Sequence, residues 1–454
     1  MGSFKFLTPG GDPRPVTRVN EARGETSHNV PYFLPDGRHF LYLLRSGKPE
    51  VAGVYVGQLD APDAPASGED PERLLATSIK AEYAAGHVLY LRGRTLLAQP
   101  FDAATLKLGG EPIPVADPVG FGGASGRAAY SVAANGTLVF GLGGREISKR
   151  LRWFDRSGKP LEELGPLAVY IDPQLAPDGR RVAVERIDSQ TDTGDLWLLE
   201  TGRDVAARFT FNPGSDNSGV WSPDGQQIIF RSNRSSPGGL YRKASSGVAA
   251  EEPFLQSPKN TNKSPLDWSA DGRYLVYGQD AAGGLDLWVL PLEGTGTSMK
   301  PGKPFAFLQS NFNEDHAQFS PDGRWLAYTS NESGRYEVYV QSFPQAGGKY
   351  QVSTGGGIAP RWRRDGRELY YIASDAKLMA VAMRGESTLE AGLLSAGAAL
   401  FQTNIHEAGG YVTTDKQQYD VTADGQRFLI NTPVEGAASA PLTVVTNFTA
   451  TLKK

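Results

Sequence analysis

The sequence contains no cysteine among its 454 residues. This absence excludes disulfide bonds, thiolate metal sites and cysteine nucleophiles, but it does not distinguish a reducing compartment from an oxidising one. The stability of the chain must therefore come from packing.

Long apolar runs and an excess of one charge are also absent. No apolar stretch approaches the roughly 20 residues that cross a bilayer, and the start, Met1-Gly2-Ser3-Phe4-Lys5, has no signal-peptide core. The 46 basic and 50 acidic residues give a formal net charge of -4 without a run of one sign. We therefore expect a soluble, monomeric chain without a membrane span and without a nucleic-acid partner.

Glycine and proline, by contrast, are plentiful. The 54 glycines and 31 prolines separate short apolar segments rich in valine, leucine, tyrosine, phenylalanine and tryptophan. This punctuation is typical of an all-β chain. No helical period of apolar residues is long enough for an independent α/β domain.

One phrase recurs along the chain: a short strand, an Asp-Gly turn and a second strand of alternating apolar residues. The clearest copies are at residues 221–225, 268–272, 319–323 and 362–366, with close matches at 33–37 and 175–179 and weaker ones at 84–86, 133–136 and 422–425. Asp-Gly and Asn-Gly supply the positive φ angles of a tight two-residue hairpin, and a preceding proline rigidifies its entry. Each phrase therefore predicts a hairpin corner.

The spacing of these corners predicts the architecture. The corner glycines are at 37, 86, 136, 179, 225, 272, 323, 366 and 425, which are 43 to 59 residues apart. That is the length of one four-stranded propeller blade. We therefore predict an all-β fold in which residues 1–454 form a single closed β-propeller of eight or nine four-stranded blades. The two termini are expected to share a blade, because such pairing removes exposed edges.

These phrases resemble TolB-like propeller repeats. The resemblance is strongest to the propeller region C-terminal to the kinase domain and membrane helix of acidobacterial-type serine/threonine protein kinases, and it is carried by residues 23–28, 33–42, 319–328, 332–340 and 360–366. It runs from about Gly10 to Lys454. It implies a periplasmic or extracytoplasmic module that senses a ligand or binds a protein, and it identifies no ligand-contacting residue.

Catalytic motifs are missing from this chain. There is no kinase His-Arg-Asp loop or Asp-Phe-Gly triplet, so kinase activity is not carried over from the resemblance. Residues 122–126, Gly-Gly-Ala-Ser-Gly, have the wrong spacing for the nucleophile elbow of a serine hydrolase and no following helix. We therefore expect a non-catalytic propeller without a cofactor, which binds at one face or at the mouth of its channel.

The candidate binding residues lie just ahead of the predicted inner strands and differ from blade to blade. Their mixture of charges and amides suits a polar ligand such as a sugar or peptide, or an unknown protein. The competing interpretation is a polar rim that keeps the channel ends hydrated. The residues are His28, Asn29, Arg127, Asp172, Asp216, Asn217, Asn262, Lys263, Asp315, His316 and Gln417.

A metal-dependent lyase or hydrolase acting on oligosaccharides at the channel mouth is the alternative function. Some TolB-like propellers resemble oligogalacturonate lyases that hold a metal with histidines on the ring axis. Here His28, His316 and His406, helped by Glu25 or Glu314, could hold Mn, Zn or Ca. The structural interpretation is that these histidines hydrogen-bond neighbouring blades. The metal hypothesis requires three or more of the five side chains to converge on one point.

Two repeated features have structural interpretations. Trp221, Trp268 and Trp362 precede their corners at matched positions, which indicates blade packing rather than a platform for stacking sugars or bases. The corner aspartates recur because the turn geometry requires them.

Overall fold

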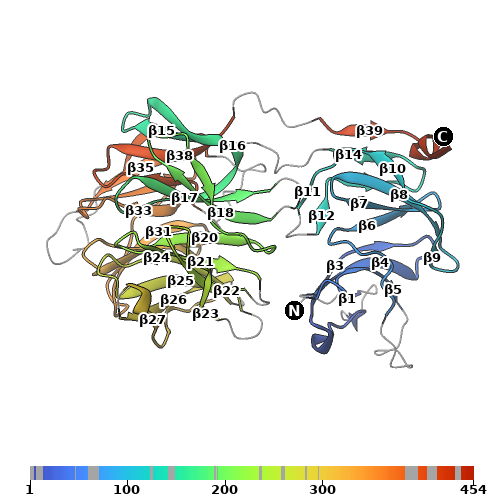
Figure 1. Cartoon of the computed structure of the whole chain (residues 1–454), viewed down its shortest axis with the longest axis horizontal. Helices are drawn as coiled ribbons and strands as arrows, with labels where there is room; N and C mark the ends of the chain where they lie inside the picture. The colour runs from blue at the N-terminus through green and yellow to red at the C-terminus, as the bar shows by residue number, and fades with distance from the viewer. Residues whose placement is uncertain are drawn as a thin grey trace. The chain divides into compact units, whose positions relative to one another are not determined.

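The computed structural model in Figure 1 is all-β. It describes residues 5–6, 14–46, 48–59, 71–122, 126–141, 149–188, 191, 193–234, 238–256, 261–281, 284–294, 296–383, 397–405, 417–434 and 441–453. Helical turns in this part of the chain are limited to the short 3-10 segments Glu21–Arg23, Gly296–Ser298 and Phe448–Lys453. None of the described helices is both long and apolar enough to cross a membrane. The predicted all-β class is confirmed.

The chain divides into two compact units. Unit 1 comprises Met1–Ile147, Ser189–Asp192 and Gly436–Lys454, and unit 2 comprises Ser148–Asp188 and Thr193–Glu435. The chain therefore leaves unit 1, builds unit 2 and returns to unit 1 at its end. The single ring expected for residues 1–454 stays a prediction, and the units are described one at a time.

The described residues of unit 1 form three sheets and two short strand pairs. The first sheet has the order β3 (Glu25–Phe33), β4 (His39–Ser46), β5 (Gly53–Gln58). The second has the order β10 (Ile113–Ala116), β8 (Thr95–Asp102), β7 (His87–Arg92), β6 (Ala81–Ala84), with β9 (Lys107–Leu108) on β8. The third has the order β13 (Tyr130–Val132), β14 (Leu138–Phe140), β39 (Thr443–Val445). The pairs are β1 (Lys5–Phe6) with β2 (Arg14–Pro15) and β11 (Phe121–Gly122) with β12 (Arg127–Ala128).

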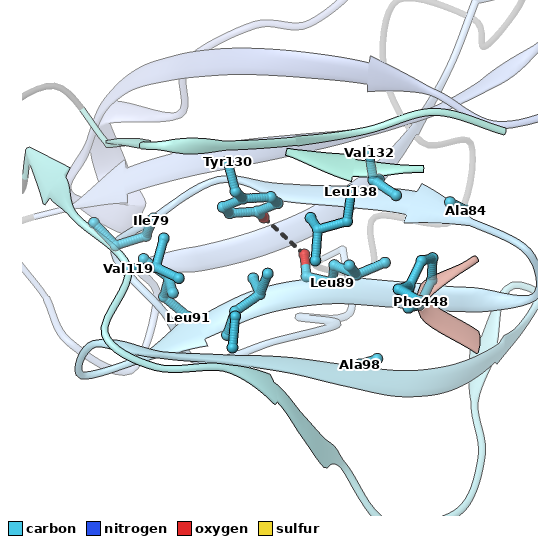
Figure 2. Packing of buried hydrophobic residues seen from close by; sticks show 12 residues of the cluster. Ile79, Ala84, Leu89, Leu91, Ala98, Val119, Tyr130, Val132, Leu138 and Phe448 are labelled. Atoms are coloured by element: carbon cyan, nitrogen blue, oxygen red, sulfur yellow. Dashed lines mark hydrogen bonds between the residues drawn. The ribbon is translucent and has the colours of Figure 1, made fainter. Parts of the chain in front are cut away.

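The end of the chain completes the core of unit 1. Phe448 is fully buried in a cluster with Leu89, Leu138 and other apolar side chains, which Figure 2 shows from close by. In the same cluster the Tyr130 hydroxyl donates to the carbonyl oxygen of Leu89 at 2.8 Å. Because β39 also pairs with β14, the C-terminal segment is a structural part of unit 1.

In the part of unit 2 that the structure describes, there are one seven-stranded sheet and four smaller ones. The seven-stranded sheet has the order β19 (Ala206–Arg208), β18 (Gly194–Glu200), β17 (Arg181–Ile187), β16 (Pro160–Leu175), β15 (Lys149–Asp155), β38 (Arg427–Pro433), β37 (Tyr419–Val421). The next two are β20 (Asp216–Trp221), β21 (Gln227–Ser232), β22 (Gly239–Ala244), β23 (Glu252–Leu255), and β24 (Lys263–Trp268), β25 (Tyr274–Ala281), β26 (Gly284–Glu293), β27 (Lys300–Pro301), with β28 (Phe305–Leu308) on β26. The last two are β29 (Glu314–Phe319), β30 (Trp325–Ser330), β31 (Glu337–Ser342), β32 (Lys349–Gln351), and β33 (Gly357–Trp362), β34 (Glu368–Ala373), β35 (Lys377–Ala382), β36 (Ala398–Gln402).

The seven-stranded sheet consists of two four-stranded halves that share β16. The first part of β16 pairs with β15, and its last part, from Val169 to Leu175, pairs with β17. On its other side β15 pairs with β38, from Lys149 opposite Pro433 to Asp155 opposite Arg427. The first and last long strands of unit 2 therefore lie in one sheet.

This pairing corrects the expectation that the two chain termini share a blade. Among the described strands, the strand after the last corner pairs with residues 149–155 and not with the N-terminal strands. The physical reason is apolar matching, because Leu151 and Trp153 pack with Leu429 in one buried cluster. Sequence position alone does not reveal that preference.

The corners form as predicted, but with a different turn. All nine corner glycines have positive φ, between 66° and 81°. In the corner at residues 222–225, the Gly225 N–H donates to the Ser222 carbonyl at 2.8 Å, and the Asp224 carboxylate accepts the Gln226 N–H at 3.0 Å. Proline suits the second position of such a four-residue turn, and only the glycine needs the left-handed region. A tight two-residue hairpin needs positive φ at both loop residues. Among the nine corners, Ala85-Gly86 alone meets this condition, so the predicted two-residue hairpin is wrong for the Asp-Gly corners.

Candidate ligand-binding pocket

A pocket of about 770 Å³ lies within unit 2 at the corner ends of its inner strands. The penultimate residue of each of six strands lines it, at matched positions in β16, β20, β24, β29, β33 and β37. These residues, which we call the ring residues, are Gln174, Val220, Asp267, Gln318, Arg361 and Asp420. All six strands thus contribute a residue from the same position to the pocket lining.

A repeated irregularity precedes the ring residues. The strand register shifts just before them in five of the six strands, as between Asn217 and Val220 in β20. Four non-glycine residues at this point have φ between 53° and 57°: Asp172, Ser218, His316 and Ala359. Such backbone costs on the order of 1–3 kcal/mol per residue and persists only where the surroundings impose it. The bulge re-aims the end of each strand.

Polar ring residues connect neighbouring sheets. The Asp420 carboxylate accepts the Leu175 N–H at 2.6 Å, and the Asp267 carboxylate accepts the Phe319 N–H at 2.8 Å. The Gln318 side-chain oxygen accepts the Trp362 N–H at 2.7 Å. The first bond joins the two halves of the seven-stranded sheet, and the other two each join a ring side chain to the inner strand of another sheet, so these side chains are held in fixed orientations.

The charges in the pocket compensate one another incompletely. Nε of Arg361 lies 3.6 Å from Oδ1 of Asp420, which is an ion pair but beyond hydrogen-bond distance. Burial raises the pKa of Asp267 to about 7, although backbone hydrogen bonds and the charge of Arg361 oppose this shift. Burial also raises the pKa of Asp420. The one guanidinium therefore does not offset the desolvation of both carboxylates.

Tryptophans form part of the pocket wall. Trp221, Trp268 and Trp362 are 5 to 8% exposed, and Nε1 of Trp221 donates to the Gln174 carbonyl at 3.0 Å. Each of the three packs in a buried apolar cluster, and all three also line the pocket. This second role was not predicted from the sequence. Their identical placement directly after the variable ring residues was the available signal.

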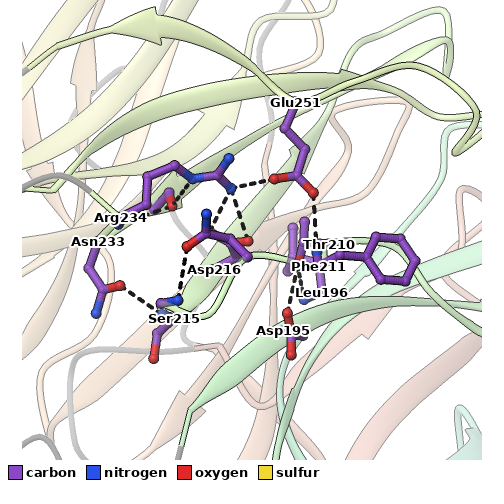
Figure 3. Close-up of polar contacts among 12 residues, drawn as sticks. Asp195, Leu196, Thr210, Phe211, Ser215, Asp216, Asn233, Arg234 and Glu251 are labelled. Carbon is purple, nitrogen blue, oxygen red and sulfur yellow. Dashed lines mark hydrogen bonds and ion pairs between the residues drawn. The ribbon is translucent and has the colours of Figure 1, made fainter.

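The predicted binding residues of unit 2 lie earlier in the same strands or just ahead of them, and none lines this pocket. They are Asp172, Asp216, Asn217, Asn262, Lys263, Asp315, His316 and Gln417, most of which are buried. Several have structural partners. Figure 3 shows Arg234 between the carboxylates of Asp216 and Glu251, with Nη2 at 3.1 Å from both oxygens of Asp216.

Two further predicted residues are similarly engaged. Nδ2 of Asn262 donates to the Asp280 carboxylate at 2.6 Å, and Nζ of Lys263 donates to Oε1 of Gln279 at 2.9 Å. These contacts supply a structural reason for polar residues at the strand starts. A ligand role for them stays a prediction.

The remaining predicted residues belong to unit 1. Nε2 of His28 lies 3.2 Å from the Glu25 carboxylate, and both side chains are buried. Burial lowers the pKa of His28, while the hydrogen bond to Glu25 opposes the shift. Asn29 contacts the Ser27 hydroxyl at 2.9 Å, and Arg127 is exposed on β12.

No metal centre emerges from the described residues. They contain no group of three or more histidine, aspartate or glutamate side chains placed to hold an ion. Glu314 accepts the Ser310 hydroxyl at 2.7 Å, and His316 is buried in the same strand. His406 lies outside the described residues, so the five-residue metal hypothesis stays a prediction.

Comparison with known proteins finds relatives that are similar to part of the chain. No family model matches the sequence. The chain is 26% identical over 219 residues to the uncharacterized peptidase YuxL of Bacillus subtilis, covering 39% of this chain and 33% of that protein. It is 24% identical over 216 residues to the uncharacterized protein Atu1656 of Agrobacterium fabrum, covering 44% of this chain and 69% of that protein. The match thus spans about a third of the Bacillus relative.

Similar solved structures include TolB proteins. A putative TolB from Agrobacterium tumefaciens has a TM-score of 0.49 at 16% identity, covering 63% of this chain and 99% of its own. TolB from Acinetobacter baumannii has a TM-score of 0.35 at 12% identity, covering 80% of each chain. An oligogalacturonate lyase in complex with manganese has a TM-score of 0.41 at 15% identity, covering 70% of this chain and 95% of its own. The protein is all-β with propeller-like neighbours, TolB-like proteins among them.

Proposed function

We propose that unit 2 is a closed six-bladed β-propeller. The two halves of the seven-stranded sheet and the four smaller sheets supply six blades. Their inner strands contact one another in the order β37, β16, β20, β24, β29, β33. The Tyr419 hydroxyl of β37 donates to the Ala359 carbonyl of β33 at 2.8 Å, which links the last inner strand to the first. We propose this ring in place of one with eight or nine blades.

We infer that this propeller is a non-catalytic module that binds its ligand or protein partner in the pocket. The observation that carries this inference is the matched ring residues at the base of an aromatic-walled pocket of about 770 Å³. This volume is within the range of about 300–1,000 Å³ typical of ligand sites. Among the described residues, the pocket lining contains no histidine or lysine, and its hydroxyls, Ser320 and Thr422, bond the corner carboxylates Asp322 and Asp424.

The sensing role and the extracytoplasmic location are part of the same proposal. They derive from the resemblance to TolB-like repeats and to the propeller region of membrane kinases. The metal-dependent alternative receives no support from the described residues, because no ligand cluster forms among them.

A blocking substitution tests the location of binding. Ala270 is an exposed corner residue that lines the pocket, and Ala270→Trp adds bulk there without removing a hydrogen-bonding group. Ala134 occupies the equivalent corner position in unit 1 and is also exposed, so Ala134→Trp is the matched control. Both variants and the parent protein are screened against polar small molecules and peptides by thermal shift.

The two variants should respond differently. Ligands that stabilise the parent protein should stabilise the Ala134 variant equally and should lose at least tenfold in affinity for the Ala270 variant. Ligands that bind all three proteins equally would contradict a site in this pocket.

A further inference from the structure

Three charged groups define the interior of the pocket. The residues that line it include the acidic Asp178, Asp267, Asp420 and Asp424 and the basic Arg361 and Arg364. Asp178 and Asp424 belong to the corner turns, where their carboxylates accept backbone N–H groups. Arg364 is exposed and donates to the Pro177 carbonyl at 2.7 Å. The ring residues Asp267, Arg361 and Asp420 therefore determine the charge at the base.

Asp267 favours a cationic group in the ligand. Its carboxylate accepts the Phe319 N–H at 2.8 Å and also interacts with the Trp268 N–H, but it has no ion pair within the part of the chain that the structure describes. Burial raises its pKa to about 7, so its charged form is poorly stabilised by the protein. An opposite charge close to a desolvated carboxylate stabilises the ionised form. A ligand cation supplies that charge.

Arg361 favours an acceptor in the ligand. The residue is only 2% exposed, and its Nε and Nη2 donate no hydrogen bond within the part of the chain that the structure describes. Buried donors without an acceptor cost free energy, and most buried polar groups in proteins have a partner. A carbonyl or carboxylate oxygen close to the ligand cation would supply one.

Apolar surface surrounds these charges. Trp221, Trp268 and Trp362 line the pocket with Phe319 and Pro321. Aromatic and proline surfaces suit an aliphatic or aromatic side chain. The pocket thus combines an anionic group, a buried cationic donor and an apolar wall.

We propose, building on the binding function above, that the pocket recognises an ammonium group with a carbonyl or carboxylate on the adjacent carbon. Free amino acids and the amino ends of peptides share this chemistry. The ammonium faces Asp267, the carbonyl oxygen accepts from Arg361, and the side chain lies against the tryptophans.

Six leucine-based probes test the two charged contacts and distinguish a free amino acid from the amino end of a peptide. L-Leucinamide and L-leucine carry both the ammonium and the carbonyl, N-acetyl-L-leucinamide lacks the ammonium, and isopentylamine lacks the carbonyl. The tripeptide amide Leu-Ala-Ala and its N-acetylated form represent a peptide amino end. Binding to the whole protein is measured by isothermal titration calorimetry.

The proposal requires leucinamide, leucine or the tripeptide to bind at least tenfold more tightly than N-acetyl-L-leucinamide and isopentylamine. If leucine binds more tightly than the tripeptide, the natural ligand is a free amino acid. If the tripeptide binds more tightly than leucine, the natural ligand is the amino end of a peptide. Isopentylamine binding as tightly as leucinamide would overturn the role of the carbonyl, and equal binding of the acetylated probes would overturn the role of the ammonium. Failure of all six probes to bind at millimolar concentration also overturns the proposal.

Two variants separate this inference from the proposed function. Asp267→Asn retains an oxygen that can accept the Phe319 N–H and removes the charge, so it should weaken the ammonium-bearing probes at least tenfold. An unchanged affinity in a folded Asp267→Asn protein refutes the contact. If Ala270→Trp abolishes the binding of other ligands found in the screen, and the leucine-based probes do not bind the parent protein, the pocket function stands and only the proposed ligand class fails. If the probes bind Ala270→Trp normally, both fail.

Discussion

Arg156 provides a direct test of how the proposed ring of unit 2 closes. The residue follows β15, and its Nη1 donates to the Tyr370 hydroxyl and the Gly425 carbonyl at 3.0 Å and to Glu368 at 3.1 Å. Glu368 and Tyr370 belong to β34. The side chain therefore connects the sheet that contains β15 and β38 to the sheet that contains β33 to β36. We predict that Arg156→Ala weakens this closure.

The structure sets the size of the effect. Hydrogen bonds that involve a charged group contribute about 1.5–3 kcal/mol each when well protected, but the Arg156 side chain is 32% exposed. Glu368 also keeps its ion pair with Arg363 at 3.1 Å in the variant, so no carboxylate is left unpaired. We therefore expect a loss of about 2 kcal/mol in the free energy of unfolding, below the range for a fully buried pair.

Arg152 supplies the matched control. It pairs with Glu163 within the β15–β16 hairpin, and both side chains are about one third exposed. Exposed ion pairs contribute about 0–1 kcal/mol. All seven tryptophans of the protein lie in unit 2, so urea unfolding followed by tryptophan fluorescence reports on this unit. If Arg156→Ala and Arg152→Ala lower stability equally, the closure reasoning is refuted.

The ion pair between Arg156 and Glu368 predicts that the stability of unit 2 depends on pH. Burial alone would raise the pKa of Glu368, but hydrogen bonds from Arg156 and Tyr370 hold it below the ordinary value of 4.5. A depressed carboxylate pKa adds stability above the pKa of the unfolded state, and this stability is lost as pH falls through the folded pKa. The difference between the parent protein and Arg156→Ala should therefore shrink below pH 4.5. A constant difference down to pH 3 would contradict the ionic origin of the effect.

Three further predictions concern a corner, the pocket and unit 1. Gly323 and Gly425 share a φ of 68°, but a Cβ added at Gly323 has no neighbour within 4 Å, whereas one added at Gly425 lies 2.3 Å from the Tyr370 hydroxyl. Urea unfolding should therefore show that Gly323→Ala lowers the free energy of unfolding by about 1 kcal/mol and that Gly425→Ala lowers it clearly more. Because burial raises the pKa of Asp267 from 3.8 to about 7, the parent protein should lose stability from pH 4 to pH 7 relative to Asp267→Asn, and parallel stability curves would contradict this. Phe448→Ala should cost unit 1 about 3–5 kcal/mol, seen as lost amide-exchange protection in unit 1, with unchanged tryptophan-detected unfolding of unit 2.

The sequence predicts local structure best where a residue has few backbone options. Glycine tolerates positive φ without strain, so nine glycines located the nine corners. The turn type was harder to predict, because a corner glycine serves two hairpin geometries that differ in the residues before it. Gly225 follows Ser-Pro-Asp and closes a four-residue turn, whereas Gly86 follows alanines and closes a two-residue one.

The partition into units depends on contacts that are distant in sequence. Corner spacings are similar throughout the chain, so spacing alone suggests one continuous ring. The pairing of β38 with β15 and of β39 with β14 joins segments more than 250 residues apart. Such pairings depend on which buried side chains fit together, as Leu429 does with Leu151 and Trp153. A repeat count does not contain that information.

The pocket escaped prediction because of the bulges in the inner strands. Residues that differ from repeat to repeat are good candidates for binding, and the ring residues do differ, since they are two glutamines, a valine, two aspartates and an arginine. An extra residue in a strand breaks the strict alternation of its side chains, so that a period of two no longer identifies the facing side. At the bulges, aspartate, serine, histidine and alanine adopt positive φ instead of glycine, which leaves no sequence mark. A conformation so rarely adopted by these residue types, repeated in four strands two residues before the ring residues, indicates that the surrounding packing imposes one orientation on the strand ends that line the pocket.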